Sequence, residues 1–117
     1  MDIEAVVARR LAGSTGIPAY VEMPSGDADP GDLLLVTRTG GGGTYMEAAQ
    51  VDVDCYSTRE GGRKRARELS ELVRRAVPEL DEEPDLFAPE VTGCYRQADP
   101  DTRRPRYVVQ LKVWICE

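Results

Sequence analysis

The segment between Tyr56 and Pro78 constrains the fold of this chain more than any other. Its apolar residues recur every three or four positions, as on one face of a helix, and most of its other positions are charged. A helix from Arg59 to Ala76 is roughly 27 Å long, about the length of an eight-residue strand. We therefore expect it to lie along a β-sheet and cover one face. The apolar stripe comprises Ala66, Leu69, Leu72, Val73, Ala76 and Val77.

The sequence predicts where this helix begins and where it ends. The run Ser57-Thr58-Arg59-Glu60 predicts a capping box, in which Ser57 accepts from the Glu60 amide and Glu60 reaches back to the Ser57 amide. Pro78 predicts the end of the helix at about Ala76, because the residue before a proline avoids the helical conformation.

The remaining elements are expected to be short. In the third expected strand, Val51, Val53 and Cys55 face the core, while Asp52 and Asp54 face water or a partner, because side chains alternate along a strand. The last strand shows the most regular alternation. The sequence predicts a first helix at Asp2–Ala12, ended by Gly13, and strands at Ala19–Met23, Leu33–Thr39, Glu47–Tyr56, Glu90–Gln97 and Arg106–Cys116.

These elements indicate an α+β fold in one domain that spans residues 1–117. We expect one mixed, mainly antiparallel sheet of about five strands, with the long helix packed on one face and a short N-terminal helix. Three segments are interpreted as loops: a flexible glycine tip at Gly40–Gly43, an acidic surface linker at Leu80–Pro89, and a polar turn at Ala98–Pro105.

Charge is unevenly distributed along the chain, whose formal net charge is -6. An acidic protein is poorly suited to nucleic acid as its main partner, because phosphate binding needs a basic face. Separated charge suits contact between copies or with a charged neighbour, although solvated faces give the same pattern. Basic residues gather at Arg59, Arg63, Lys64, Arg65, Arg67, Arg74 and Arg75; acidic ones gather at Asp27, Asp29, Asp32, Glu79, Asp81, Glu82, Glu83 and Asp85.

The chain lacks the residues of common catalytic and metal sites. It has no histidine, and its three cysteines (Cys55, Cys94 and Cys116) form no C-x-x-C pair, so we expect no catalytic site, no metal and no cofactor. Asp52 and Asp54 could hold a divalent cation, but no third acidic ligand is placed by the sequence. Cys94 and Cys116 are interpreted as thiols packed within strands.

No membrane partner or export is expected. No apolar run reaches the ~18 residues of a membrane span, and the N-terminus lacks the basic start and apolar stretch of a signal peptide. We expect the protein to be made in a reducing cytosol, since an odd number of widely spaced cysteines does not indicate disulfides.

Two segments carry a resemblance to a known family. The run Gln50–Ser57 leads into a helix with Arg63, Ala66, Leu69 and Val73, and the closing strand is Tyr107–Ile115. In pattern, size and element order, the chain resembles the tail terminator (tail-completion, or minor tail) proteins of long-tailed bacteriophages and prophages.

The resemblance implies a structural virion protein and not an enzyme. It implies a ring of six copies at the tail–neck junction that caps the tail tube and joins it to the head. The implied partners are further copies, the tail tube protein, and the head–tail connector or head-closure protein. The glycine run and the dense acidic linker depart from the family pattern, so which surface meets the tube stays open.

The residues give candidates for the contacts between subunits. Arg59, Arg63 and Arg67 lie on the basic helix and would set orientation, whereas apolar side chains would supply affinity: Leu34, Val36, Tyr45 and Trp114. Two alternatives stay open. One is a head-closure or neck adaptor of the same virion; the other is a small cytosolic α+β ligand-binding protein or enzyme that uses Asp52, Asp54 or an arginine cluster.

Overall fold

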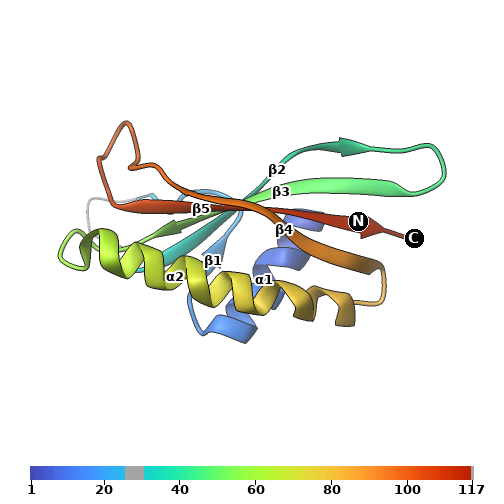
Figure 1. Cartoon of the computed structure of the whole chain (residues 1–117), viewed down its shortest axis with the longest axis horizontal. Coiled ribbons are helices and arrows are strands. Elements are labelled where there is room, and N and C mark those ends of the chain that lie inside the picture. Colours follow the sequence, from blue (N-terminus) through green and yellow to red (C-terminus); the bar gives the residue numbers. More distant parts are fainter. Residues whose placement is uncertain (26–30, 117) are drawn as a thin grey trace.

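A five-stranded sheet runs through the molecule, and both α-helices lie on one of its faces (Figure 1). The structure, a computed structural model, describes residues 1–25 and 31–116. The strands lie in the order β1-β2-β3-β5-β4. Their bounds are Ala19–Tyr20 (β1), Leu33–Gly42 (β2), Glu47–Tyr56 (β3), Leu86–Arg96 (β4) and Arg106–Ile115 (β5); the helices are Ile3–Thr15 (α1), Gly62–Ala76 (α2) and a 3-10 helix at Val77–Glu82 (η1).

The sheet is mixed, and the predicted α+β class is confirmed. Strand β1 runs parallel to β2, whereas the pairs β2–β3, β3–β5 and β4–β5 are antiparallel. The bounds of β3 are those that the sequence predicted, and β4 and β5 form the predicted hairpin. The first strand is shorter than the expected Ala19–Met23, because only Ala19 and Tyr20 pair with β2.

Helix α1 is longer than predicted. Its N-terminus is capped by Asp2, whose carboxylate accepts from the Ala5 amide at 3.1 Å. Gly13 does not end the helix; Gly16 does, with a left-handed φ of 75° and an amide that donates to the Ala12 carbonyl at 2.9 Å. Gly13 is tolerated inside the helix, whereas the left-handed turn that ends the helix favours a glycine at position 16.

The predicted capping box is wrong. Helix α2 begins at Gly62, which has a left-handed φ of 65°, so residues 59–61 form a turn before it. The buried Ser57 hydroxyl lies 2.8 and 2.9 Å from the carbonyl oxygens of Thr58 and Gly62 and does not cap an amide. Thr58 accepts from the Gly61 amide instead, at 3.0 Å.

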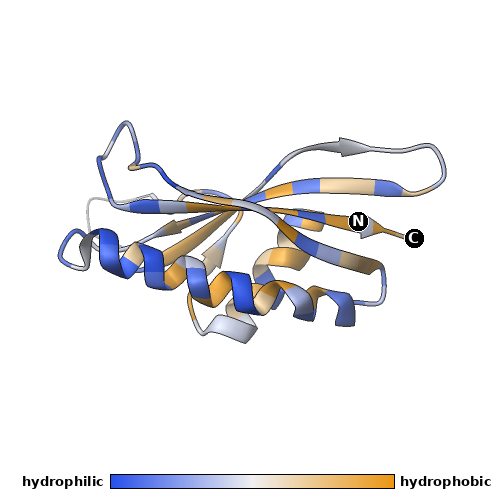
Figure 2. Cartoon of the chain, in the orientation of Figure 1, coloured by the Kyte–Doolittle hydropathy of each residue, from blue (hydrophilic) through white to orange (hydrophobic). Residues whose placement is uncertain are grey.

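The apolar stripe of α2 packs onto the sheet as predicted. Ala66, Leu69, Val73 and Ala76 are buried, and Leu72 is partly buried against the same core. Figure 2 shows the contrast along α2, where hydrophilic residues alternate with hydrophobic ones.

The segment after α2 is not the wandering linker that the sequence predicted. Pro78 ends the α-helix, but the chain continues as η1, and Leu80 is fully buried beneath it. Strand β4 then starts at Leu86, four residues before the predicted start at Glu90, and Leu86 is also buried. The two leucines anchor a segment whose charged composition alone indicated a loop.

The glycine run is mostly strand and not a hairpin tip. Gly40, Gly41 and Gly42 belong to β2 and pair with Gln50, Ala49 and Ala48. A Cβ atom on Gly41 would lie 1.8 Å from the Ala48 carbonyl oxygen, and φ there is +112°. Glycine is therefore required by close strand approach and by backbone conformation, and the turn itself lies at residues 43–46.

Candidate assembly surface

We call the sheet face opposite the helices the open face, and the strand register defines it. Residues paired directly across antiparallel strands point to the same side. One row across β2, β3 and β5 is Thr37, Asp52 and Gln110, and the row beside it is Leu35, Asp54 and Val108. The open face thus presents these rows together with Gln50, Lys112 and Trp114.

An apolar strip crosses one end of the open face. Trp114 of β5 pairs with Ala48 of β3 on one side and with Phe87 of β4 on the other. The Trp114 and Phe87 rings stack with centroids 6.3 Å apart, and the Lys112 ammonium lies 4.9 Å from the Trp114 ring centroid. Trp114 is therefore half-buried within its own subunit, and part of its surface stays exposed.

Leu34 and Val36 are not available for an interface. Both have an exposed fraction of 0% and belong to the core cluster on the helix side of β2, together with Val7 and Leu11 of α1. The prediction that these two residues contact another subunit is therefore wrong. The short N-terminal helix, and not a neighbouring subunit, buries it.

Tyr45 is the most exposed large hydrophobic side chain described, with 98% of its surface exposed. It lies in the turn between β2 and β3, and Met46 beside it is 48% exposed. Figure 1 shows this hairpin projecting beyond the rest of the sheet. Of the predicted apolar candidates, Tyr45 and Trp114 are thus the two that reach solvent.

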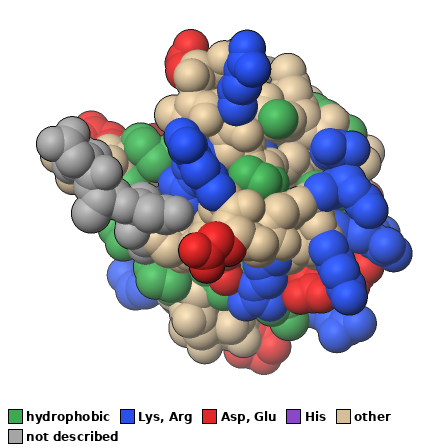
Figure 3. All heavy atoms as spheres, turned by 90° about the vertical axis from the view of Figure 1, so that its left-hand side faces the viewer, with side chains coloured by type: hydrophobic (Ala, Val, Ile, Leu, Met, Phe, Trp, Pro, Cys, Tyr) green, Lys and Arg blue, Asp and Glu red, His purple; other side chains and the backbone are tan. Residues whose placement is uncertain are grey.

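The basic candidates lie in the turn before α2 and in the first two turns of that helix. Arg59, Arg63 and Arg67 are exposed, and Figure 3 shows Lys and Arg side chains gathered on this end of the molecule. The Arg67 guanidinium pairs with Glu71 at 3.3 Å, and Arg59 donates to the Thr102 carbonyl at 3.4 Å. Arg63 and Lys64 make no ion pair with another residue that the structure describes.

The acidic segments are largely neutralised inside the subunit. Asp32 pairs with Arg65 at 2.9 Å and accepts from the Thr58 amide at 3.2 Å. Glu83 pairs with Arg10 at 2.9 Å and with Arg9 at 3.9 Å.

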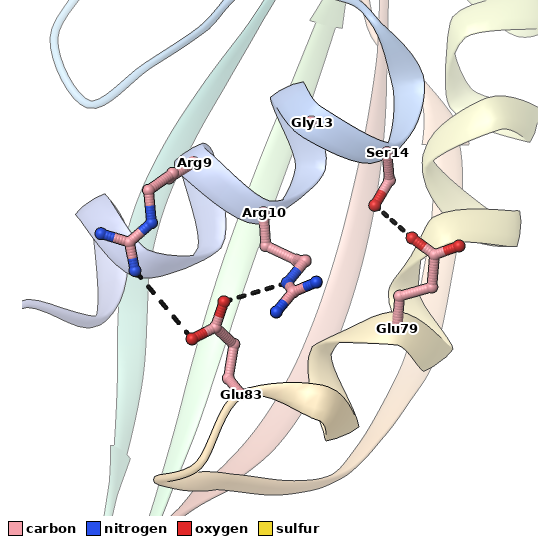
Figure 4. Close-up of a pocket in the computed structure, with 6 residues that line it drawn as sticks. All are labelled: Arg9, Arg10, Gly13, Ser14, Glu79 and Glu83. Atoms are coloured by element: carbon pink, nitrogen blue, oxygen red, sulfur yellow. Dashed lines mark hydrogen bonds and ion pairs between the residues drawn. The ribbon is translucent and has the colours of Figure 1, made fainter.

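Figure 4 shows the two ion pairs of Glu83 in a hollow between α1 and η1, where the Ser14 hydroxyl also donates to Glu79. Glu82 adds an ion pair with Arg10 at 3.3 Å. Glu79, Glu82 and Glu83 therefore hold α1 against η1 and its C-terminal end, instead of offering a free acidic patch. Asp27 and Asp29 of the predicted acidic cluster lie outside the described residues.

A polar cluster covers the other end of the open face. The Tyr56 hydroxyl donates to Asp99 at 2.8 Å and accepts from Arg106 at 3.2 Å, while Arg106 also lies 3.5 Å from the Asp54 carboxylate. Burial, with the hydrogen bond to Asp99, raises the pKa of Tyr56 to about 12. Asp99 accepts from the amides of Asp101 and Thr102 at 2.8 and 3.1 Å, which shapes the loop between β4 and β5.

The pKa values of the carboxyl groups near this face are shifted in opposite directions. Burial raises the pKa of Asp54, although the nearby Arg106 opposes the shift, and burial also raises the pKa of Asp52. Partial burial acts in the same direction on Asp99, but hydrogen bonds from the Thr102 amide and the Tyr56 hydroxyl outweigh it and lower the pKa of Asp99.

Arg104 is an anchor that sequence reasoning did not find. It is buried, its Nη2 donates to the carbonyl oxygens of Gly31 and Ser57 at 2.9 Å each, and its guanidinium carbon lies 5.3 Å from the Tyr56 ring centroid. The Ser57 amide also donates to the Pro105 carbonyl at 3.2 Å. The polar composition of residues 98–105 carries no signal for this anchoring, because the partners are far away in the sequence.

The three cysteines are free thiols that differ in exposure. Cys55 is buried, and burial raises the pKa of its thiol above the usual range. Cys94 and Cys116 are exposed, so the interpretation of both as packed strand thiols is wrong. Cys94 lies on the edge strand β4, and Cys116 follows the last residue of β5.

Two further observations concern other site classes. Within residues 1–25 and 31–116, no three His, Cys, Asp or Glu side chains gather into a group that could hold a metal ion, and Asp52 and Asp54 therefore belong to no such group there. Among the helices described, none is both long and apolar enough to cross a membrane. Comparison with protein-family models and with curated proteins gives no match for the chain.

Proposed function

We propose that this chain is a structural virion protein, the tail terminator of a long-tailed bacteriophage. In this proposal six copies form a ring that caps the tail tube and joins it to the head–tail connector or head-closure protein. The element order that the family resemblance implies, a helix, three strands, a long helix and a closing hairpin, is the order that the chain has.

The observation that carries the proposal is the apolar surface that the helices leave uncovered. Tyr45 at the end of the projecting hairpin and the strip of Trp114, Phe87 and Ala48 lie toward the same end of the sheet, because Ala48 is three residues from Tyr45 and pairs with Trp114. Large aromatic side chains outside the core are typical anchors of protein interfaces. This apolar end and the basic start of α2 lie at opposite ends of the molecule (Figure 1), and two different surfaces on one subunit favour a head-to-tail contact, which closes into a ring when the rotation allows it.

Charge supports the same arrangement. The basic residues at the start of α2 keep unpaired members, whereas the acids near α1 are used within the subunit. The basic end is therefore free to orient a neighbouring subunit or another virion protein. Exposed pairs contribute only about 0–1 kcal/mol each, so they would set orientation more than affinity.

The proposal is tested by removing the protein from the phage or prophage that encodes it. A stop codon early in the gene should give heads without joined tails, and tails of irregular length, when the lysate is viewed by electron microscopy. Plasmid-encoded protein should restore joined particles. Joined particles of normal tail length in the absence of the protein would overturn the proposal.

A further inference from the structure

The β2–β3 turn carries an aromatic side chain that its own subunit leaves almost entirely uncovered. Tyr45 is 98% exposed, and close backbone approaches lie on both sides of the hairpin end: a Cβ atom on Gly41 would lie 1.8 Å from the Ala48 carbonyl oxygen of β3, and one on Gly43 would lie 1.8 Å from the Met46 carbonyl oxygen within the turn. The pairing of β2 with β3 continues to Gly42 and Ala48, so the two strands carry the turn with Tyr45 out from the rest of the sheet (Figure 1). An arm of paired strands with an exposed aromatic end is suited to insertion into a groove.

The chain also has a groove whose chemistry complements a tyrosine. It lies between α2 and the edge strand β4, has a volume of about 310 Å³, and is lined by Glu71, Arg74, Arg75 and Val91. Arg74 and Arg75 are exposed and form no ion pair within the described part of the chain, while Val91 packs against the core. Guanidinium groups stack on aromatic rings, an apolar floor accepts the ring edge, and the Glu71 carboxylate can accept from a phenolic hydroxyl.

The hollow between α1 and η1 is a poorer match. Its cations Arg9 and Arg10 already pair with Glu83, and its Ser14 hydroxyl is used by Glu79 (Figure 4). A tyrosine that entered there would have to displace ion pairs that hold two elements of the fold together. In the groove beside β4, Arg74 and Arg75 are not engaged, and among the described residues Glu71 pairs only with Arg67 on the same helix, so no contact between two elements of the fold has to be broken.

The arm and the groove lie on different sides of the subunit. Strands β3 and β5 separate β2 from β4 in the sheet, and Figure 1 shows the arm projecting away from α2. We propose that Tyr45 of one copy inserts between Arg74 and Arg75 of the next copy, so that each subunit both gives and receives an arm. This junction rests on the proposed ring and identifies the two surfaces that close it.

The junction is tested with purified protein by native mass spectrometry. Tyr45→Ala removes the ring, and Arg74→Gln with Arg75→Gln removes the cations; each variant should weaken association more than tenfold, as loss of an aromatic or arginine anchor does. Tyr45→Phe keeps the aromatic face and should lose less than the alanine variant. Arg96→Gln, at an exposed arginine of β4 that forms no ion pair within the described part of the chain, is the matched control and should assemble like the parent.

A mixture of the two defective variants shows whether the arm and the groove meet each other. The intact arm of the double glutamine variant meets the intact groove of the Tyr45→Ala variant, so the mixture should give a heterodimer that grows no further. Circular dichroism and thermal unfolding should show that both variants are folded. If the parent forms rings and Tyr45→Ala forms them equally well, or if the mixture gives no heterodimer, this junction is wrong while the ring stands. A parent that stays monomeric overturns both.

Discussion

At the level of single residues, the core position Leu69 gives the simplest test of the packing. It is fully buried on the face of α2 that meets the sheet, so Leu69→Ala should lower the free energy of unfolding by about 2–5 kcal/mol. Leu72→Ala, at a partly buried position of the same helix, should cost less. Urea unfolding measures both. A loss below roughly 0.5 kcal/mol at Leu69 is typical of surface sites and would contradict the packing of α2.

The acids of the open face give a second test, with a sign fixed by their pKa shifts. Burial raises the pKa of Asp52, so its ionised form is disfavoured in the folded state, and the cost appears as pH rises through that pKa. Asp52→Asn should therefore match or exceed the parent in melting temperature at pH 7. Its advantage should vanish as pH falls below the raised pKa.

Asp99 is the matched control because its pKa is lowered. Its carboxylate contributes stability above its unfolded pKa, and that contribution is lost as pH falls through the lowered value. Asp99→Asn should therefore reduce the melting temperature at pH 7, with a difference that shrinks below about pH 4. Variants of Asp52 and Asp99 that shift the melting temperature in the same direction at pH 7 would refute these assignments.

At the level of elements, replacement by alanine should have opposite effects on stability at Gly41 and at Gly13. Gly41→Ala places a Cβ against the Ala48 carbonyl at a φ of +112° and should cost more than about 1 kcal/mol. Gly13→Ala, inside α1 with open space around the new methyl group, should stabilise the protein by about 0.5–1 kcal/mol. Thermal unfolding of the two variants checks the pair, and a harmless alanine at position 41 would remove the steric role of the glycine run.

Elements with a clear period could be predicted, whereas elements fixed by distant contacts could not. The alternation around Val51, Val53 and Cys55 sufficed for β3, and the stripe around Leu69 sufficed for α2. The apolar residues of β2 did not reveal what covers them, because a helix and a neighbouring subunit demand the same residues. Leu34 and Val36 were therefore assigned to the wrong surface.

Dependence on distant contacts also explains why two buried residues in polar segments were not predicted. Arg104 is buried through carbonyl groups at Gly31 and Ser57, and Leu80 is buried beneath an acidic turn. Composition indicates exposure in both cases, and only the packed fold supplies the partners. Tyr45 and Trp114, which the sequence singled out as aromatic residues on loops or strand faces, do keep exposed surface.

At the level of the whole molecule, the basic residues at the start of α2 are predicted to orient the assembly. Arg63→Glu with Arg67→Glu should leave the fold intact, since both side chains are exposed, but should weaken association at low salt, where the parent is strongest. Arg65→Glu is the contrasting variant, because Arg65 pairs with Asp32 inside the subunit, and it should lower the melting temperature. Light scattering across salt concentrations measures association. Equal association of parent and double variant at all salt concentrations would show that the basic end is merely solvated.

The central claim is that identical subunits close into a ring, and the native mass of the purified chain tests it most directly. At micromolar concentration the account predicts a discrete species of six times the subunit mass, without a ladder of longer oligomers, because a closed head-to-tail contact leaves no free end. A protein that stays monomeric across the accessible concentration range, or that grows into open filaments, would contradict it.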